Sequence, residues 1–402
     1  MATFAIIAEY NPFHSGHEYH IRKIREQFGK DTAIVIIMSG NFTQRGEVAF
    51  ADKLTRARCA LSCGANLVVE LPFPYSMASA DIFAKSAIHI ANSLGFVDYL
   101  SFGSESGDIT LLEKVASVID SQVFTEAFKK LSSDRSLGYA KAMELAYLEC
   151  KGSADDFTFT SNNILAIEYI KSLKKSNSDI KPHTVKRCGA EYSSEVIDVG
   201  KTHQSASAIR KEFYESAENA FSYLPDESRT ILEEGLLNGE LPCDGERLSS
   251  AIISHYRLSS VAAKTSIHDA GNGLYNRLIS ASYKASNISS LLALTETKKF
   301  TRARIRRAIW YGFLGVTSSD VKTAPRFTQI LAMDSIGISR LKTVRKTDSF
   351  SILTKPADYK HFDNVALCQK KLSERADSVF ELTRPKPKEG NNALKLTPFV
   401  KK

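Results

Sequence analysis

The sequence predicts an α/β protein with a doubly wound parallel sheet in its first part and a mostly α-helical second part. Residues 1–110 alternate β-branched runs with helical segments, which is the pattern of βαβ units. From about residue 225 onward the apolar residues recur with helical spacing, and no run of strands follows. A chain of 402 residues has room for two or three domains. We therefore predict one domain over 1–220 and a helical, basic domain over 221–402.

The expected elements follow one another in order along the first domain. Strands are predicted at TFAIIAEY, AIVIIMSG, NLVVELPF and VDYLSFGSES, which are rich in β-branched or aromatic residues. Between them, HEYHIRKIREQF, DKLTRARCALSCG and SADIFAKSAIHIANSLG have helical spacing, and the last segment ends at Gly95. Residues 111–175 look helical, with an interruption near 152–161. HTVKRCGAEY then predicts a strand and a loop, and SASAIRKEFYE a helix with serine caps.

Ligands of such sheets bind beyond the carboxyl ends of the strands. In this chain those ends are residues 9–17, 39–46, 70–74 and 102–106. We expect the four segments to line one crevice.

Composition excludes several classes of protein. Hydrophobic residues make up 43% of the chain and charged residues 24%, which is typical of a globular protein rather than a disordered one. No apolar run approaches the roughly 18 residues of a membrane span, and the N-terminus enters a strand without a basic leader, so we expect a cytoplasmic protein. The six cysteines form no CxxC pair, which argues against a zinc ribbon or a disulfide framework.

Charge is distributed unevenly along the chain. Residues 1–250 contain 26 Lys and Arg against 34 Asp and Glu, whereas residues 251–402 contain 27 against 11. A basic excess confined to one region is the expected footprint of a polyanion, although a solvated surface is the simpler alternative. We expect nucleic acid to bind the second part.

Three histidines follow the first strand in the stretch EYNPFHSGHEYH, at positions 14, 17 and 20. Zinc-binding pairs on a helix usually stand four residues apart, so the spacing of three disfavours a metal site. A phosphate site explains more of the residues. Ser15 and Gly16 allow close approach of the backbone, and the helix start supplies free N–H groups to an anion. His14 and His17 would then donate to phosphate oxygens as charge develops there, while a purely structural pair stays open.

The segment His14-Ser15-Gly16-His17 resembles the (H/T)xGH signature of the nucleotidylyltransferase superfamily. SASAIRKEF resembles its second signature, a serine-rich helix start with an arginine, represented here by Ser205, Ser207 and Arg210. The resemblance implies a Rossmann-like nucleotidylyltransferase domain that performs adenylyl transfer. Its catalytic residues would be His14, His17 and Arg210.

A closer resemblance spans most of the chain. AEYNPFHSGHEYH, SGNFTQRGEVAFADKLTRARCALSCGANLVVELPF, LSFGSES, SNNILAIEYIKSL, VKRCGAEY, SASAIRK and FTRARIRRAI together resemble the bacterial tRNA(Met) cytidine acetate ligase family. This implies a ligase that activates acetate with ATP as acetyl-adenylate. The acetyl group would pass to N4 of the wobble cytidine of elongator tRNA(Met), giving N4-acetylcytidine.

The resemblance also implies an ATP site. Mg²⁺ is expected on the triphosphate, without an Asp or Glu cluster to identify a protein ligand. The expected ATP-binding residues are Ile7, Ala8, Glu9, Tyr10, Asn11, Pro12, Phe13, His14, Ser15, Gly16, His17, Glu18, Tyr19, His20, Gly103, Asn162, Arg187, Cys188, Ser205 and Ser207.

Two basic helices are candidates for tRNA contact. TRARIRRAIWYGF places Arg302 and Arg306 on one helical face, with Arg304 and Arg307 on neighbouring faces. In DKLTRARCA, Lys53 and Arg56 are further candidates, although an ordinary amphipathic helix explains them equally well.

Two other functions stay open at this stage. A small-molecule nucleotidylyltransferase would use the same motifs, but the basic second part would have no purpose. A noncatalytic RNA-binding protein with a nucleotide fold is the other alternative, and the intact His14, His17 and Arg210 count against it. The sequence assigns no oligomeric state.

Overall fold

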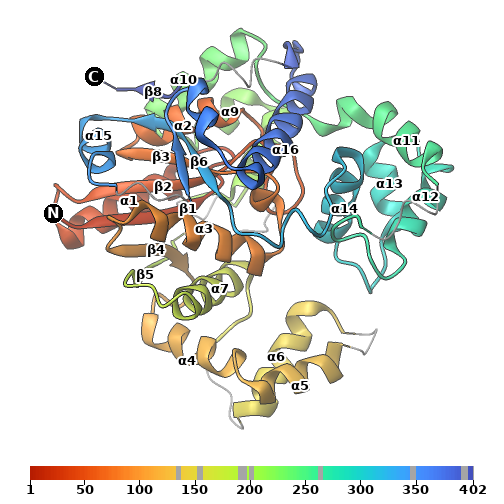
Figure 1. The fold of residues 1–402 in the computed structure, drawn as a ribbon, viewed down its shortest axis with the longest axis horizontal. Helices are drawn as coiled ribbons and strands as arrows, with labels where there is room; N and C mark the ends of the chain where they lie inside the picture. Colours follow the sequence, from red (N-terminus) through yellow and green to blue (C-terminus); the bar gives the residue numbers. More distant parts are fainter. Residues whose placement is uncertain are drawn as a thin grey trace.

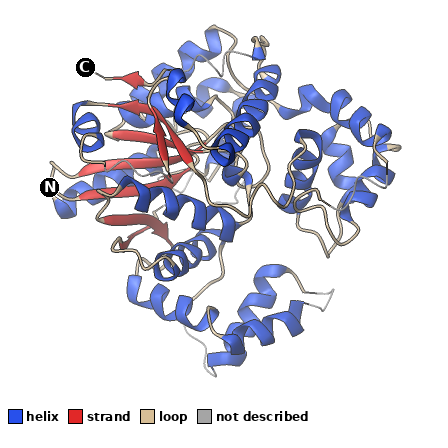
Figure 2. Ribbon diagram, viewed as in Figure 1, coloured by secondary structure: helices blue, strands red, loops and turns tan. Residues whose placement is uncertain are grey.

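A central sheet with helices on both faces forms the body of the protein (Figures 1 and 2). Parts of two expected segments, residues 152–156 and 189–192, lie outside the described residues. The computed structural model describes residues 1–132, 137–151, 157–188, 197–198, 203–260, 266–344, 350–390 and 397–401.

The sheet has the order β5-β4-β1-β2-β3-β6-β7, with β8 paired to β6. The strands from β5 to β3 are parallel to their neighbours, and β1 lies between β4 and β2. The chain therefore builds outward from β1 in both directions, which confirms the doubly wound arrangement. The strands are β1 (Thr3–Ala8), β2 (Ala33–Ser39), β3 (Leu67–Leu71), β4 (Tyr99–Ser104), β5 (Lys181–Lys186), β6 (Phe327–Met333), β7 (Ser351–Leu353) and β8 (Phe399–Val400).

Alternate residues of the central strands supply two separate cores. In β2, Ile34 and Ile36 pack in one hydrophobic cluster, whereas Val35 and Ile37 pack in the other. Both sets are fully buried, so the run reads as continuously apolar, as expected for a parallel strand covered on both faces. The covering helices are α1 (Ser15–Phe28), α2 (Lys53–Ser62), α8 (Ala206–Glu215), α9 (Ala217–Phe221) and α10 (Asp226–Leu237) on one face, and α3 (Ala80–Leu94), α4 (Ile109–Ile119) and α7 (Ser161–Lys175) on the other.

Two helical parts flank the sheet (Figure 1). The first is the pair α5 (Gln122–Ser132) and α6 (Tyr139–Lys151). The second has its own core, in which the hydroxyl of the buried Tyr256 donates to the carbonyls of Ala308 (3.0 Å) and Ile309 (2.8 Å). Phe42, which follows β2, packs against Trp310 in this core, with ring centroids 5.2 Å apart. The second part contains α11 (Ser249–Leu258), α12 (Leu274–Ser282), α13 (Ile288–Thr295) and α14 (Arg302–Leu314).

After residue 225 the described chain is mostly helical, as predicted, but it also contains β6, β7 and β8, which the sequence analysis did not predict. β6 pairs antiparallel with β3, so residues 327–333 extend the sheet of the first part. Helices α15 (Ser335–Leu341) and α16 (Asn364–Phe380) follow, and α16 packs beside the core of α11 to α14. The division near residue 220 stays a prediction, and β6 weighs against placing all of 221–402 outside the sheet domain.

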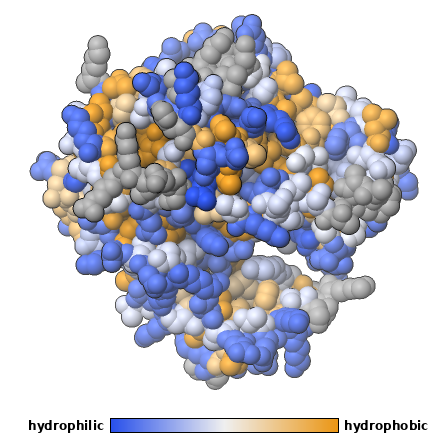
Figure 3. All heavy atoms as spheres, in the orientation of Figure 1, coloured by the Kyte–Doolittle hydropathy of each residue, from blue (hydrophilic) through white to orange (hydrophobic). Residues whose placement is uncertain are grey.

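Hydrophilic side chains cover most of the face in Figure 3, with hydrophobic side chains scattered among them. None of the helices in the described ranges has both the length and the apolarity of a membrane span.

Candidate nucleotide-binding site

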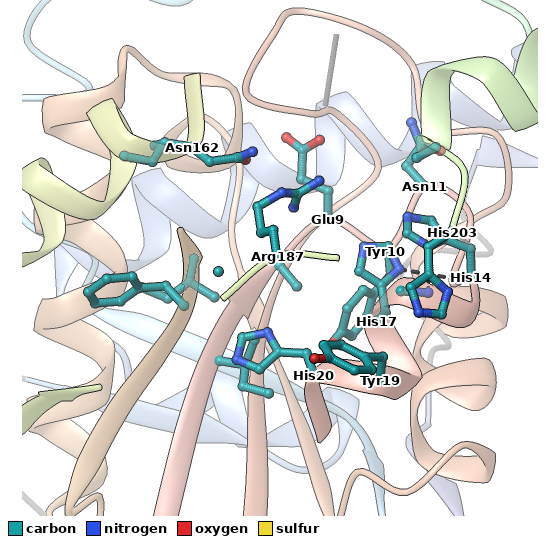
Figure 4. Close-up of a pocket in the computed structure, with 18 of the residues that line it drawn as sticks. Glu9, Tyr10, Asn11, His14, His17, Tyr19, His20, Asn162, Arg187 and His203 are labelled. Carbon is teal, nitrogen blue, oxygen red and sulfur yellow. Dashed lines mark hydrogen bonds between the residues drawn. The ribbon is translucent and has the colours of Figure 1, made fainter. Parts of the chain in front are cut away.

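A pocket lies at the carboxyl ends of β1, β4 and β5, beside the start of α1 (Figure 4). Its lining takes residues from three of the four predicted strand ends, including Glu9, Gln44 and Gly103. The fourth segment, residues 70–74, does not reach the pocket. The Glu70 side chain instead lies in a buried ion pair with Lys53. The prediction of one crevice is therefore confirmed for three strand ends and wrong for the end of β3.

His14 and His17 occupy the start of α1. The backbone N–H of Gly16 donates to His14 Nδ1 at 3.1 Å, and the backbone N–H of His14 donates to His17 Nδ1 at 3.2 Å. Both Nδ1 atoms therefore act as acceptors, which assigns the proton of each neutral ring to Nε2. The two rings are in contact, with centroids 3.7 Å apart and planes tilted by 31°. Each histidine is thus left with an Nε2–H donor for a ligand in the pocket.

Burial keeps these histidines neutral. Burial and, to a smaller extent, the positive charge of Arg187 together lower the pKa of His14 to about 3. Burial and the neighbouring His14 likewise hold the pKa of His17 well below its ordinary value. At neutral pH the pair therefore donates two hydrogen bonds without contributing positive charge.

His20 also lines the pocket, but its ring is engaged by the sheet. His20 Nε2 lies 2.7 Å from the Oγ atom of Ser101 in β4, and Ser101 Oγ lies 3.0 Å from His183 Nδ1 in β5. These contacts fix α1 against the two strands. His20 therefore shapes the pocket from its floor.

The second signature lies beside the loop that leads into the first, because Arg210 contacts Asn11. Ser205 caps α8 by accepting from the backbone N–H of Ala208 at 3.0 Å, as the sequence predicted. Arg210 donates to the carbonyl of Asn11 at 2.8 Å and to Glu47 at 2.9 Å. Ser207 and Arg210 line the pocket, and the guanidinium brings positive charge to the loop before α1.

Residues from β4, β5 and α7 form the third side of the pocket. Figure 4 shows Arg187 between Asn162 and the histidine pair. Glu105 accepts from Asn162 Nδ2 at 2.8 Å, and Arg187 Nε lies 3.6 Å from the same carboxylate oxygen. A Cβ atom on Gly103 would lie 3.1 Å from the Arg187 side chain, so glycine leaves space for this arginine. Gly103, Asn162, Arg187 and Cys188 all line the pocket, as predicted.

Some of the expected ATP-binding residues lie outside the pocket lining. Phe13 is buried in the core below α1, and Ser15 hydrogen-bonds His203 at 2.9 Å. Ile7, Ala8, Glu9, Tyr10, Asn11, His14, Gly16, His17, Tyr19 and His20 do line it, whereas Pro12, Phe13, Ser15, Glu18 and Ser205 do not.

The loop after β2 contributes two residues from the predicted segment 39–46 and one residue, Glu47, to which the sequence analysis had assigned no role. Gln44, Arg45 and Glu47 line the pocket on the side of α14. The backbone N–H of Gln44 donates to Glu9 at 2.7 Å, while burial raises the pKa of Glu9. In the sequence, the position of SGNFTQRGE directly after a predicted strand was the feature that could have identified these residues as part of the site.

The assignment of Lys53 and Arg56 to tRNA contact is wrong, because both side chains are buried. Lys53 Nζ donates to Glu70 at 2.8 Å and to Asp377 at 2.6 Å, which joins α2 to β3 and α16. Arg56 donates to the backbone carbonyls of residues 9, 39, 40 and 51. Both cations therefore hold the fold together.

The four arginines of α14 differ in exposure. Arg302 is exposed, whereas Arg304 is half-buried and donates to the carbonyl of Asp269 at 3.0 Å. Arg306 is half-buried and bonds Glu47 at 2.5 Å. Arg307 is buried in an ion pair with Asp269 at 2.6 Å, so its inclusion among the tRNA contacts is wrong.

The described residues contain no group of three or more His, Cys, Asp or Glu placed to hold a metal ion. The carboxylates nearest the nucleotide pocket are already engaged by Gln44, Arg210 and Arg306.

Comparison with known proteins matches this architecture. A family model described as HIGH Nucleotidyl Transferase matches residues 1–393. The tRNA(Met) cytidine acetate ligase of Thermoanaerobacter sp. (strain X514) is 36% identical over 379 residues, which covers 92% of this chain and 93% of that protein. The apo structure of Thermotoga maritima TmcAL is 29% identical and covers 100% of this chain and 99% of that one, with a TM-score of 0.91. The same enzyme bound with alpha-thio ATP aligns over the same shares at 29% identity, with a TM-score of 0.89.

Proposed function

The chain belongs to the HIGH nucleotidyl transferases and, among them, to the tRNA(Met) cytidine acetate ligases, and from this membership we propose that it acetylates tRNA(Met) with acetate and ATP. The enzyme is a ligase that joins an acetyl carbon to a cytidine nitrogen. Acetate is activated as acetyl-adenylate in the pocket described above. The acetyl group then passes to N4 of the wobble cytidine of elongator tRNA(Met).

One observation supports adenylation most directly: two neutral histidines present their Nε2–H donors in a pocket at the start of α1. The positive end of the α1 helix dipole lies beside the same pocket. The free N–H groups expected from the sequence are not available there, because the N–H groups of residues 15–18 already bond Tyr223 and His14. Arg187 and Arg210 line the same pocket and bring guanidinium groups to it. These donors match the negative charge of an ATP triphosphate, and TmcAL of Thermotoga maritima binds an ATP analogue.

In the adenylation step, an acetate oxygen attacks the α-phosphorus of ATP and pyrophosphate leaves with the electron pair of the broken bond. Negative charge grows on the phosphoryl oxygens and on the leaving group. Donors that are already in place stabilise this charge without reorganisation. We assign this role to His14 and His17, with Arg210 as a further phosphate ligand.

In the second step, the acetyl group is transferred from acetyl-adenylate, a mixed anhydride, to the tRNA. The N4 amine attacks the acetyl carbonyl carbon, AMP leaves, and the amine loses a proton. An exocyclic cytidine amine is a weak nucleophile, so it needs an acyl group with a leaving group as good as AMP. The anticodon base must be unstacked to present this amine. We assign the grip on the tRNA backbone to Arg302 and Arg306 of α14.

We propose that Mg²⁺ is bound by the triphosphate of ATP. The carboxylates beside the pocket are engaged by arginines or backbone groups, so phosphate oxygens and water would supply most of the coordination. Acetate is proposed as the second small substrate. Because the acceptor is a tRNA, we place the reaction in the cytoplasm.

The test is incubation of purified protein with ATP, acetate and total tRNA, followed by nucleoside mass spectrometry. We expect N4-acetylcytidine to form only when both ATP and acetate are present. Acetylation from acetyl-CoA without ATP would overturn the assignment of the donor. Acetate-dependent exchange of pyrophosphate into ATP, measured without tRNA, separates this ligase from a noncatalytic RNA-binding protein.

A further inference from the structure

A second groove lies next to the nucleotide pocket and shares Glu47 and Arg210 with it. One wall is the turn after β2, from Gly46 to Val48, and the other walls come from α8, α13 and α14. The two hollows therefore meet at one carboxylate and one guanidinium. A molecule lying in the groove would reach the nucleotide pocket past these two side chains.

The wall between the hollows is held tightly against α14. Gly46 has a φ of +76°, and a Cβ atom there would lie 2.6 Å from the backbone nitrogen of Arg307. Glu47 then bridges the two sides, since it accepts from Arg210 at 2.9 Å and from Arg306 at 2.5 Å. The width of the groove is thus fixed by backbone contact and by two ion pairs.

The groove offers positive charge that the fold does not use. Arg302 lines it and is exposed, and its side chain makes no hydrogen bond or ion pair with any residue in the described ranges. Glu246, an acid in the same groove, is occupied by donors from Ser249, Ile288 and Ser289. The open cation is therefore Arg302, with Arg306 beside it on the same helical face.

Tyr214 supplies an aromatic surface at the junction. It is 64% exposed and lines the groove, and it stands four residues after Arg210 on α8. Side chains four residues apart on a helix are neighbours, so the ring lies next to the arginine that both hollows share. Within the described part of the chain, its only ring contact is an edge-on one with Phe213, at 6.0 Å between centroids.

We propose that this groove binds one unstacked nucleotide of the tRNA, with its base against the ring of Tyr214 and an adjacent phosphate on Arg302 and Arg306. The inference rests on the proposed function and deepens it. Exposed aromatic rings next to arginines are the usual elements of single-stranded nucleic acid sites. A base held at this junction directs its exocyclic amine toward the nucleotide pocket, where the acetyl-adenylate forms.

The test compares three tyrosine variants of the full chain. Tyr214→Ala removes the stacking surface, and Tyr214→Phe keeps the ring. Tyr283→Ala is the matched control, because Tyr283 is 65% exposed in the helical part but does not line the groove. The readouts are the KM for tRNA in acetyl transfer and the rate of acetate-dependent pyrophosphate exchange without tRNA.

We expect Tyr214→Ala to raise the KM for tRNA about tenfold, on the scale of losing one base-stacking contact. The rate of pyrophosphate exchange without tRNA should be the same in Tyr214→Ala as in the parent protein. Tyr214→Phe should restore the KM for tRNA. Tyr283→Ala should resemble the parent protein in both measurements. An unchanged KM in Tyr214→Ala, or an equal rise in Tyr283→Ala, would overturn the groove assignment. If the parent protein itself shows neither exchange nor acetylation, the proposed function fails instead.

Discussion

Replacing His14 separates two roles that the structure gives to one ring. Its Nδ1 caps α1 by accepting from the backbone N–H of Gly16, and its Nε2–H is left for the nucleotide. His14→Ala removes both roles. His14→Asn keeps a side-chain oxygen near the position of Nδ1, and asparagine is among the preferred helix N-caps, but it has no counterpart of Nε2–H.

The two losses have different sizes and different readouts. Loss of the cap should lower the free energy of unfolding by about 1 kcal/mol in His14→Ala, and His14→Asn should recover most of it. Loss of a donor to the transition state should slow adenylation by about 10²–10³-fold in both variants. The structure thus predicts that asparagine restores stability and leaves activity low.

Adenylation is measured as acetate-dependent exchange of pyrophosphate into ATP, and stability by chemical denaturation of the same preparations. Parallel recovery of exchange and stability in His14→Asn would show that His14 is only a helix cap. Near-normal exchange in His14→Ala would refute the catalytic assignment altogether.

Three further predictions concern charge. Arg302→Ala/Arg306→Ala should weaken tRNA binding and reduce its salt dependence by about one unit of slope per lost phosphate contact. Filter binding over a range of salt measures this, and unchanged affinity would make this face of α14 an ordinary solvated surface. Lys53→Met should lower the free energy of unfolding by about 3–5 kcal/mol, because Glu70 and Asp377 stay buried without their cation; weaker tRNA binding at undiminished stability would contradict this. Burial lowers the pKa of His20 to about 3 in the folded protein, below its value in the unfolded chain, so folding stability falls as pH drops below about 6.5. His20→Gln should flatten this dependence between about pH 6 and pH 4 by about 1.4 kcal/mol per pH unit, and an identical pH profile in both proteins would refute the reasoning.

Local pattern was sufficient for the strands that start the chain. Residues 33–39 form an uninterrupted β-branched run, and the structure places them as a strand buried on both faces. The strand at 327–333 was missed because it follows a long helical region and pairs antiparallel with β3, more than two hundred residues earlier in the chain. Local periodicity carries no information about such a distant partner.

The same limit applies to the site. His14, His17 and Arg210 belong to short motifs at helix starts, so their common pocket could be predicted from the order of βα units. Lys53 looked like a surface cation because the sequence shows charge but not burial. Its partner Asp377 stands 324 residues away and meets it only through the packing of α16 on the sheet.

The role of Glu47 could not be predicted from sequence patterns. Glu47 lies one residue beyond the strand-end segment 39–46 that was expected to line the crevice. Its importance comes from its place between Arg210 and Arg306, which are brought together by two separate helices. That bridge exists only in three dimensions.

The most direct test of the central claim follows the oxygen atoms of acetate. Acetate whose carboxylate carries a heavy oxygen isotope is supplied with ATP and tRNA, and the released AMP is examined by mass spectrometry. If acetate attacks the α-phosphorus, one labelled oxygen stays on AMP when the cytidine amine takes the acetyl group. We predict one labelled oxygen in AMP for each N4-acetylcytidine formed. Label in inorganic phosphate, or acetylated tRNA accompanied by unlabelled AMP, would contradict an acetyl-adenylate in this pocket.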